Sequence, residues 1–179
     1  MKKIVLTFGL IAGLICGGMF FITMPSDGKI DFENGQLYGY ITMFIALSTI
    51  FFAVRQYRDN YNGGVIKFGK AFLIGLYITL VATVIYVIAW ELYFNNFAPD
   101  FMDQYIAYMR ESMSSSGLSE TEIDEKMAPQ VAMFESYGEN TIMRMGLTSI
   151  EIIPVGLLIS LISGLIYGVF LKKKPAVGV

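Results

Sequence analysis

The chain has 179 residues, of which 55% are apolar and 16% charged. Soluble domains carry about a quarter of charged residues, so this composition favours a membrane protein. The net charge of −2 gives no reason to expect nucleic-acid binding, and the absence of histidine removes the commonest metal ligand. The single cysteine, Cys16, permits no intrachain disulfide.

Four apolar segments predict membrane-spanning helices. A helix needs about 20 apolar residues to cross a hydrocarbon core of about 30 Å, and it satisfies its own backbone groups there. The predicted spans are residues 4–24, 37–54, 71–93 and 147–171. The sequence therefore predicts one all-α membrane domain over residues 1–179, a four-helix transmembrane bundle. A helical extracytoplasmic excursion over about 94–146 separates spans three and four.

The first span has a second interpretation. Lys2 and Lys3 resemble the charged start of a signal peptide, but the apolar run is long and no small-x-small cleavage site follows it. Cys16 lacks the small residues expected before a lipoprotein cysteine. An uncleaved anchor is the favoured interpretation.

Two spans carry small residues at four-residue spacing, which places those residues on one helix face and lets backbones approach closely. The first ridge is on span one and the second on span four: Gly9, Gly13 and Gly17; Gly156, Ser160, Gly164 and Gly168. We expect the two spans to pack on each other through these ridges, or one ridge to form a homodimer.

Basic residues indicate the orientation, because lysine and arginine collect on the cytoplasmic side of spanning helices. Nine of the 13 basic residues flank the two termini and the 55–70 connection, where Asp59 is the only acid. Both termini are therefore predicted to be cytoplasmic, with Lys172, Lys173 and Lys174 anchoring the last span. Asn62, Gly63 and Gly64 predict a turn; phosphate or lipid-headgroup contact is the alternative role for this stretch.

The excursion predicts two helices. One apolar stripe repeats every four residues, Ser119 and Glu122 match a capping box, and Pro129 disturbs the helix that follows. The stripes are Phe101, Tyr105, Met109 and Met113, and then Ile123, Met127 and Val131. They either pack together or at the headgroup level, or form a partner-binding surface.

Two acids lie at span ends and form, with a nearby arginine, a candidate polar pocket. Ionisable residues at membrane depth suggest function, and Pro154 would kink the helix just after Glu151. Glu151 is about two turns from Arg144, and Glu91 closes span three. The simpler interpretation is that these acids reach interfacial water; a polar pocket or an ion-coupled site is the alternative.

The stretches "FGLIAGLICGG", "YGYITMFIALSTIFFAVRQYRD" and "NGGVIKFGKAFLIGLYITLVATVIYVIAWELYF" resemble the bacterial membrane family called domain of unknown function 4199. The resemblance is weakest over residues 112–140. It implies a small multi-pass bacterial membrane protein and brings no activity, substrate or site residue.

No phosphate-binding loop, catalytic or metal motif occurs, so we expect no catalytic residue and no cofactor. The favoured function is a non-enzymatic protein of the bacterial cytoplasmic membrane that binds a partner or helps to organise the cell envelope. A small oligomeric transporter using Glu91 or Glu151 is the alternative, and an intramembrane enzyme has only the acids in its favour.

Overall fold

The computed structural model describes residues 1–23 and 30–171. Within them the chain forms helices and short connections: α1 Lys2–Thr23, α2 Phe32–Leu47, α3 Thr49–Tyr61, α4 Phe68–Phe97, α5 Phe101–Ser115, α6 Glu120–Glu139, α7 Thr141–Leu165 and the π-helical turn η1 Ile166–Phe170. Met24, Lys29 and Lys172–Lys174, which entered the span and orientation predictions, lie outside the described residues.

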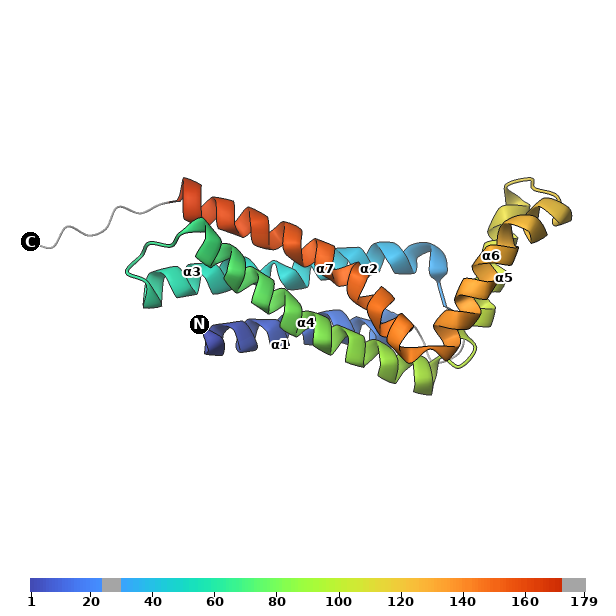
Figure 1. Cartoon of the computed structure of the whole chain (residues 1–179), viewed down its shortest axis with the longest axis horizontal. Helices are drawn as coiled ribbons and strands as arrows, with labels where there is room; N and C mark the ends of the chain where they lie inside the picture. Colours follow the sequence, from blue (N-terminus) through green and yellow to red (C-terminus); the bar gives the residue numbers. More distant parts are fainter. Residues whose placement is uncertain (24–29, 172–179) are drawn as a thin grey trace, which may run out of the picture.

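The predicted fold class is confirmed. In the described part of the chain, four helical stretches are long and apolar enough to cross a membrane: Lys2–Thr23, Phe32–Tyr61, Phe68–Phe97 and Thr141–Phe170. They run along the long axis of the molecule, and α5 and α6 project from one end of the bundle as a hairpin (Figure 1). Many large apolar side chains on these helices are exposed, as expected for surfaces that face lipid.

The spanning helices are longer than the apolar runs in the sequence. The predicted bounds follow the apolar run, whereas an α-helix continues for as long as its backbone bonds do. The third span therefore begins at Phe68 and ends at Phe97, outside the predicted bounds of 71 and 93 at both ends.

A short interruption divides the second span at Ser48. The Ser48 hydroxyl donates to the carbonyl of Phe44 at 2.6 Å, and the Thr49 hydroxyl donates to the carbonyl of Ala46 at 2.7 Å. Such hydroxyl bonds to the preceding turn compete with the helical ladder and bend helices. The stretch therefore consists of α2 and α3.

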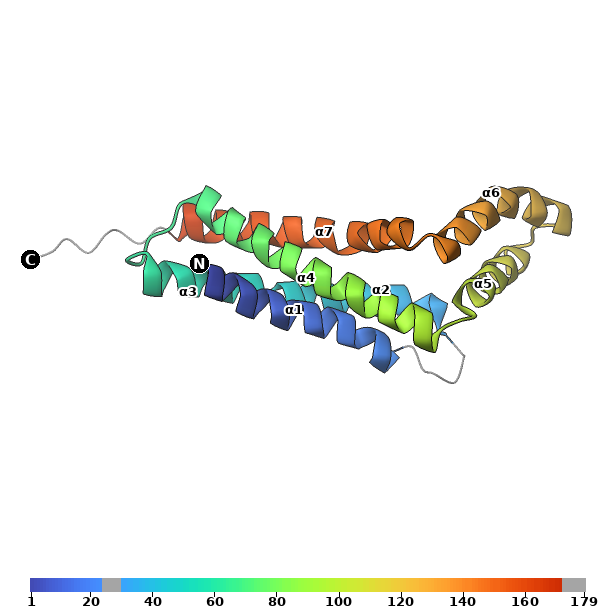
Figure 2. The ribbon, with the colours of Figure 1, turned by 60° about the horizontal axis from the view of Figure 1, so that its bottom comes forward.

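The predicted contact between the two small-residue ridges is wrong. The ridge on α1 faces α4, where a methyl group on Gly9, Gly13 or Gly17 would meet Val81, Ile85 or Ala89. As the residue numbers rise along α1, the residues they meet on α4 rise as well, so α1 and α4 run parallel (Figure 2).

The ridge on α7 faces α4 from another side. Gly156 approaches Thr79, Ser160 approaches Gly75, and Gly168 approaches the backbone of Phe68. As the residue numbers rise along α7, the residues they meet on α4 fall, so the two helices are antiparallel. The sequence pattern identified the packing faces, but α4 is the shared partner of both. It carries small residues of its own at the same four-residue spacing, Ala71, Gly75, Thr79 and Thr83.

At the opposite end of the bundle from the hairpin, α3 turns into α4. Gly63 and Gly64 have φ values of 63° and 80°, a left-handed conformation that glycine adopts without strain. The Arg58 guanidinium lies 5.0 Å from the ring centroid of Tyr167, just after α7. This contact joins the turn to the last helix.

The hairpin has the predicted capping box: the Glu122 backbone N–H donates to the Ser119 hydroxyl, and the Ser119 backbone N–H donates to the Glu122 carboxylate. Hydrogen bonds from Ser119 lower the pKa of Glu122. The helix continues through Pro129 to Glu139, and Ile123 and Met127 are buried. An ion pair between Arg110 and Asp124 links the two helices.

Candidate functional site

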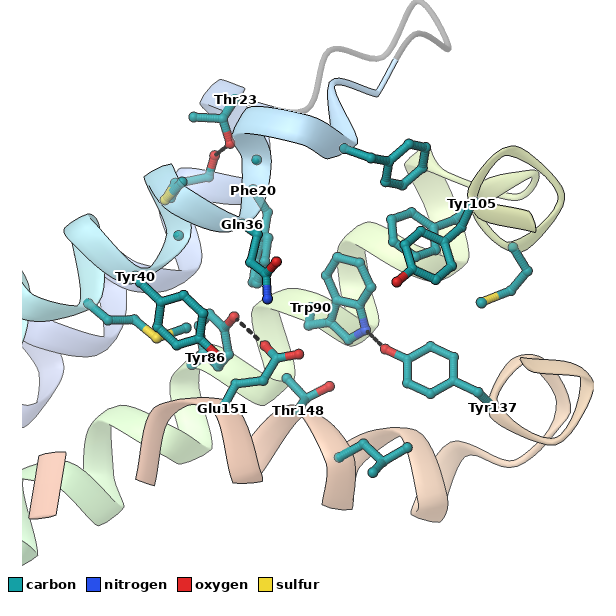
Figure 3. A pocket seen from close by; sticks show the side chains of 18 of the residues that line it. Phe20, Thr23, Gln36, Tyr40, Tyr86, Trp90, Tyr105, Tyr137, Thr148 and Glu151 are labelled. Atoms are coloured by element: carbon teal, nitrogen blue, oxygen red, sulfur yellow. Dashed lines mark hydrogen bonds between the residues drawn. The ribbon is translucent and has the colours of Figure 1, made fainter. Parts of the chain in front are cut away.

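A cavity of about 460 Å³ lies where the hairpin meets the bundle. Its walls come from α1, α2, α4, α5, α6 and α7 (Figure 3). Small-molecule sites in proteins have volumes of about 300–1,000 Å³ and are mostly apolar with a few placed polar groups. The cavity has this size and composition.

The first turns of α2 form part of the cavity wall. Asp31 caps this helix: its carboxylate accepts hydrogen bonds from the backbone N–H of Asn34 at 3.1 Å and from the Asn34 side-chain amide at 3.0 Å. These bonds lower the pKa of Asp31, the side-chain bond most. Further along α2, Gln36 and Tyr40 point into the cavity toward Tyr86 and Glu151 (Figure 3).

Glu151 lies in the cavity wall on α7. Its carboxylate accepts a hydrogen bond of 3.0 Å from the hydroxyl of Tyr86 on α4, a side chain that is buried. The glutamate itself remains exposed, and none of the described residues forms an ion pair with it. Because Glu151 is seven residues beyond Arg144, it lies about 10 Å further from the hairpin along the axis of α7.

Trp90 and Tyr137 tie the hairpin to the bundle across the same cavity. The indole N–H of Trp90 donates to the hydroxyl of Tyr137 at 2.7 Å. Phe20 packs on Trp90 with 4.9 Å between ring centroids, and Phe101 meets Trp90 edge-on at 5.1 Å. Burial raises the pKa of Tyr137 to about 12, so its hydroxyl stays protonated well into the alkaline range.

Arg144 and Glu91 form a separate, buried ion pair beside the cavity. Two guanidinium nitrogens of Arg144 donate to the two carboxylate oxygens of Glu91 at 2.8 and 2.7 Å, the bidentate geometry of a strong pair. Arg144 also donates to the backbone carbonyls of Tyr137 and Gly138, and its guanidinium lies 4.3 Å from the ring centroid of Phe94. It thereby fixes the junction between α6 and α7.

The three residues of the predicted polar pocket are thus divided. Glu151 lines the cavity, whereas Glu91 and Arg144 bind each other and are absent from its lining. Sequence reasoning missed Tyr86, Trp90 and Tyr137, because their pairing joins positions 47 and 65 residues apart. The available signal was the chain's only tryptophan among aromatic residues that the predicted topology places at one end.

Among the described residues, no three carboxylate or cysteine side chains lie close enough to hold a metal ion. The cavity instead offers the carboxylates of Glu33 and Glu151, hydroxyl and amide groups, and aromatic faces. This set can bind a ligand through hydrogen bonds, charge and apolar contact.

Comparison with known proteins gives one match. The family described as "Protein of unknown function (DUF4199)" matches residues 7–168, nearly the whole chain. No curated protein and no solved structure matches significantly.

Proposed function

Because the chain belongs to the family described as Protein of unknown function (DUF4199), we propose a function from its site: it is a non-enzymatic membrane protein that binds a small amphipathic molecule. The proposed location is the bacterial cytoplasmic membrane. Both termini are on the cytoplasmic side, as the distribution of basic residues suggests, and the α5–α6 hairpin is outside.

The observation that carries the proposal is the cavity with an exposed carboxylate inside the spanning region. A glutamate at membrane depth is energetically costly and usually belongs to a functional site. Glu151 is held by Tyr86 but lacks an ion-pair partner among the described residues. A bound ligand would satisfy the carboxylate.

The apolar stripe of α5 contributes to the cavity. Phe101 and Tyr105 of α5 and Phe134 of α6 line the cavity, so the aromatic start of the stripe faces inward. This supports ligand binding between hairpin and bundle over recognition of a protein partner on the outer face.

A carrier is the second candidate function. Glu151 favours it, because a carboxylate within a cavity at membrane depth is a common coupling group. Glu91, the other acid expected to take part, is held by Arg144. A carrier here would therefore depend on Glu151 alone.

The binding proposal can be tested through Trp90, the only tryptophan, whose emission reports on the cavity directly. Wild-type protein in nanodiscs would be titrated with a brominated alkyl maltoside, because bromine quenches indole on contact. We expect saturable quenching that Gly39→Leu weakens at least about tenfold, equivalent to about 1.4 kcal/mol.

Gly39 lines the cavity, and a side chain added there meets open space. Gly18→Leu is the matched control, since Gly18 also faces open space but does not line the cavity. Quenching that is linear with probe concentration and equal in all three proteins would contradict the proposed function.

A further inference from the structure

We propose that the cavity selects ligands with a positively charged head group, an amine or quaternary ammonium on an apolar body. This inference rests on the proposed function and adds the chemical class of the ligand. It depends on the charges and rings of the cavity wall.

The charged side chains of the wall are all acidic. Glu33 and Glu151 line the cavity, and no lysine or arginine does so within residues 1–23 and 30–171. A cavity with one sign of charge and low-dielectric walls concentrates ligands of the opposite sign. A cation is the ligand charge that such a wall attracts.

Arg144, about two turns before Glu151 on α7, does not compensate the charge of Glu151. Arg144 directs its guanidinium to Glu91 and to the end of α6, and it is almost fully buried, with 2% of its surface exposed. Its positive charge is therefore already neutralised by Glu91. An anionic ligand would be repelled by Glu151, and no basic side chain among the described lining residues would offset that repulsion.

Aromatic side chains make up much of the same cavity wall. Ten of the 23 residues lining the cavity are aromatic, against 15% of the whole chain. Phe20, Tyr86 and Trp90 form one cluster, with Phe20 5.0 Å from Tyr86 and 4.9 Å from Trp90 between ring centroids. Aromatic faces attract ammonium groups, and cages of them recognise quaternary ammonium ligands.

The wall also accommodates an apolar body. Met19, Met43, Met102 and Met133 join the rings, and methionine adapts to the shape of an apolar ligand. The head group would lie between Glu151 and the Phe20–Tyr86–Trp90 cluster, and the apolar body would extend toward the hairpin.

The test compares three matched ligands: dodecyltrimethylammonium chloride, dodecyl maltoside and dodecyl phosphate. Each displaces the brominated probe from full-length protein in zwitterionic nanodiscs, below its micelle concentration and at constant salt, with Trp90 emission as readout. For the wild type we expect the cation to compete at least about tenfold more strongly than the maltoside, and the phosphate more weakly than either.

In Glu151→Gln the cation should lose this advantage while the maltoside competes as before, which also shows that the variant is folded. Glu33→Gln should reduce the advantage by less, and Glu125→Gln, an exposed acid outside the cavity, should leave it unchanged. Equal competition by all three ligands in the wild type, or an advantage unchanged in Glu151→Gln, would overturn the charge inference while ligand binding stands. Absence of any saturable probe binding would instead contradict the proposed function.

Discussion

Arg144 is the residue on which the junction between hairpin and bundle most depends. It brings together Glu91 of α4, the carbonyls that end α6, and the Phe94 ring. A charge buried at this depth is tolerated only when each of its donors has a partner. Removing it leaves the Glu91 carboxylate, 13% exposed, without its cation.

We expect Arg144→Met to lower the free energy of unfolding by about 3 kcal/mol or more, because breaking one side of a buried pair leaves an uncompensated charge. Arg110→Met is the matched control. Arg110 pairs with Asp124 on the exposed hairpin, where such pairs contribute about 0–1 kcal/mol. Thermal unfolding of both variants in the same detergent measures the difference, and equal losses would contradict a special role for Arg144.

Tyr137 should ionise about two pH units later than an ordinary tyrosine. Its pKa is raised to about 12 by burial, so the stability that the neutral hydroxyl contributes is complete below about pH 10 and lost as the pH rises toward 12. The tyrosinate oxygen would still accept the hydrogen bond from the indole N–H of Trp90, and it would quench the fluorescence of that indole.

The expected result is alkaline quenching of Trp90 emission with a midpoint near pH 12, which Tyr137→Phe reduces. Tyr105→Phe is the control, because Tyr105 also lines the cavity but does not bond to Trp90. A midpoint near 10, or a curve unchanged in Tyr137→Phe, would exclude this assignment.

At the scale of elements, α4 organises the bundle. It packs parallel to α1 and antiparallel to α7, and both neighbours place their glycines against it. Closely approaching backbones gain van der Waals contact, which stabilises helices in membranes. A methyl group at these contacts should therefore be costly.

Gly17→Ala tests the α1–α4 contact. The new methyl carbon would lie 2.6 Å from the Cβ of Ala89, which has no side-chain freedom to move away. Overpacking of this kind costs about 1–3 kcal/mol. Gly18→Ala, one residue on, meets nothing within 4 Å and should be neutral or slightly stabilising, since alanine favours helix.

Thermal unfolding of the two alanine variants under identical conditions makes the comparison. Similar midpoints for both would show that the α1–α4 contact is looser than the structure has it.

The elements differ in how far the sequence predicts them. The four spans and the Ser119 cap follow from local patterns, and both are present. The break at Ser48 was missed because it depends on hydroxyl bonds within one turn. The helix that each glycine ridge contacts could not be predicted from spacing alone, because spacing identifies a packing face but not the surface opposite it.

At the scale of the whole molecule, the orientation is accessible to a simple experiment. The only native cysteine, Cys16, is buried. Labelling by a thiol reagent would therefore report on a cysteine introduced at an exposed position. In intact bacterial cells an impermeant thiol reagent should label Ser114→Cys in the hairpin and spare Tyr61→Cys at the α3–α4 turn, both exposed positions. The reverse pattern would overturn the proposed topology.

The cavity shows why a sequence gives architecture more readily than a site. Hydropathy identifies what crosses the membrane, but the wall combines six helices. Glu151 was identifiable because an acid in an apolar span is conspicuous. Tyr86 and Trp90 were not, because aromatic residues near span ends are ordinary interfacial features.

The central place of α4 has a consequence for biogenesis. Ribosomes deliver α1 to the membrane first, yet the surface that covers its glycine face, around Val81 to Ala89, follows about 70 residues later. At synthesis rates of about 5–20 residues per second, that is a delay of about 4–14 s. During this interval α1 waits in lipid, or against the insertion machinery, with its closest packing surface unoccupied.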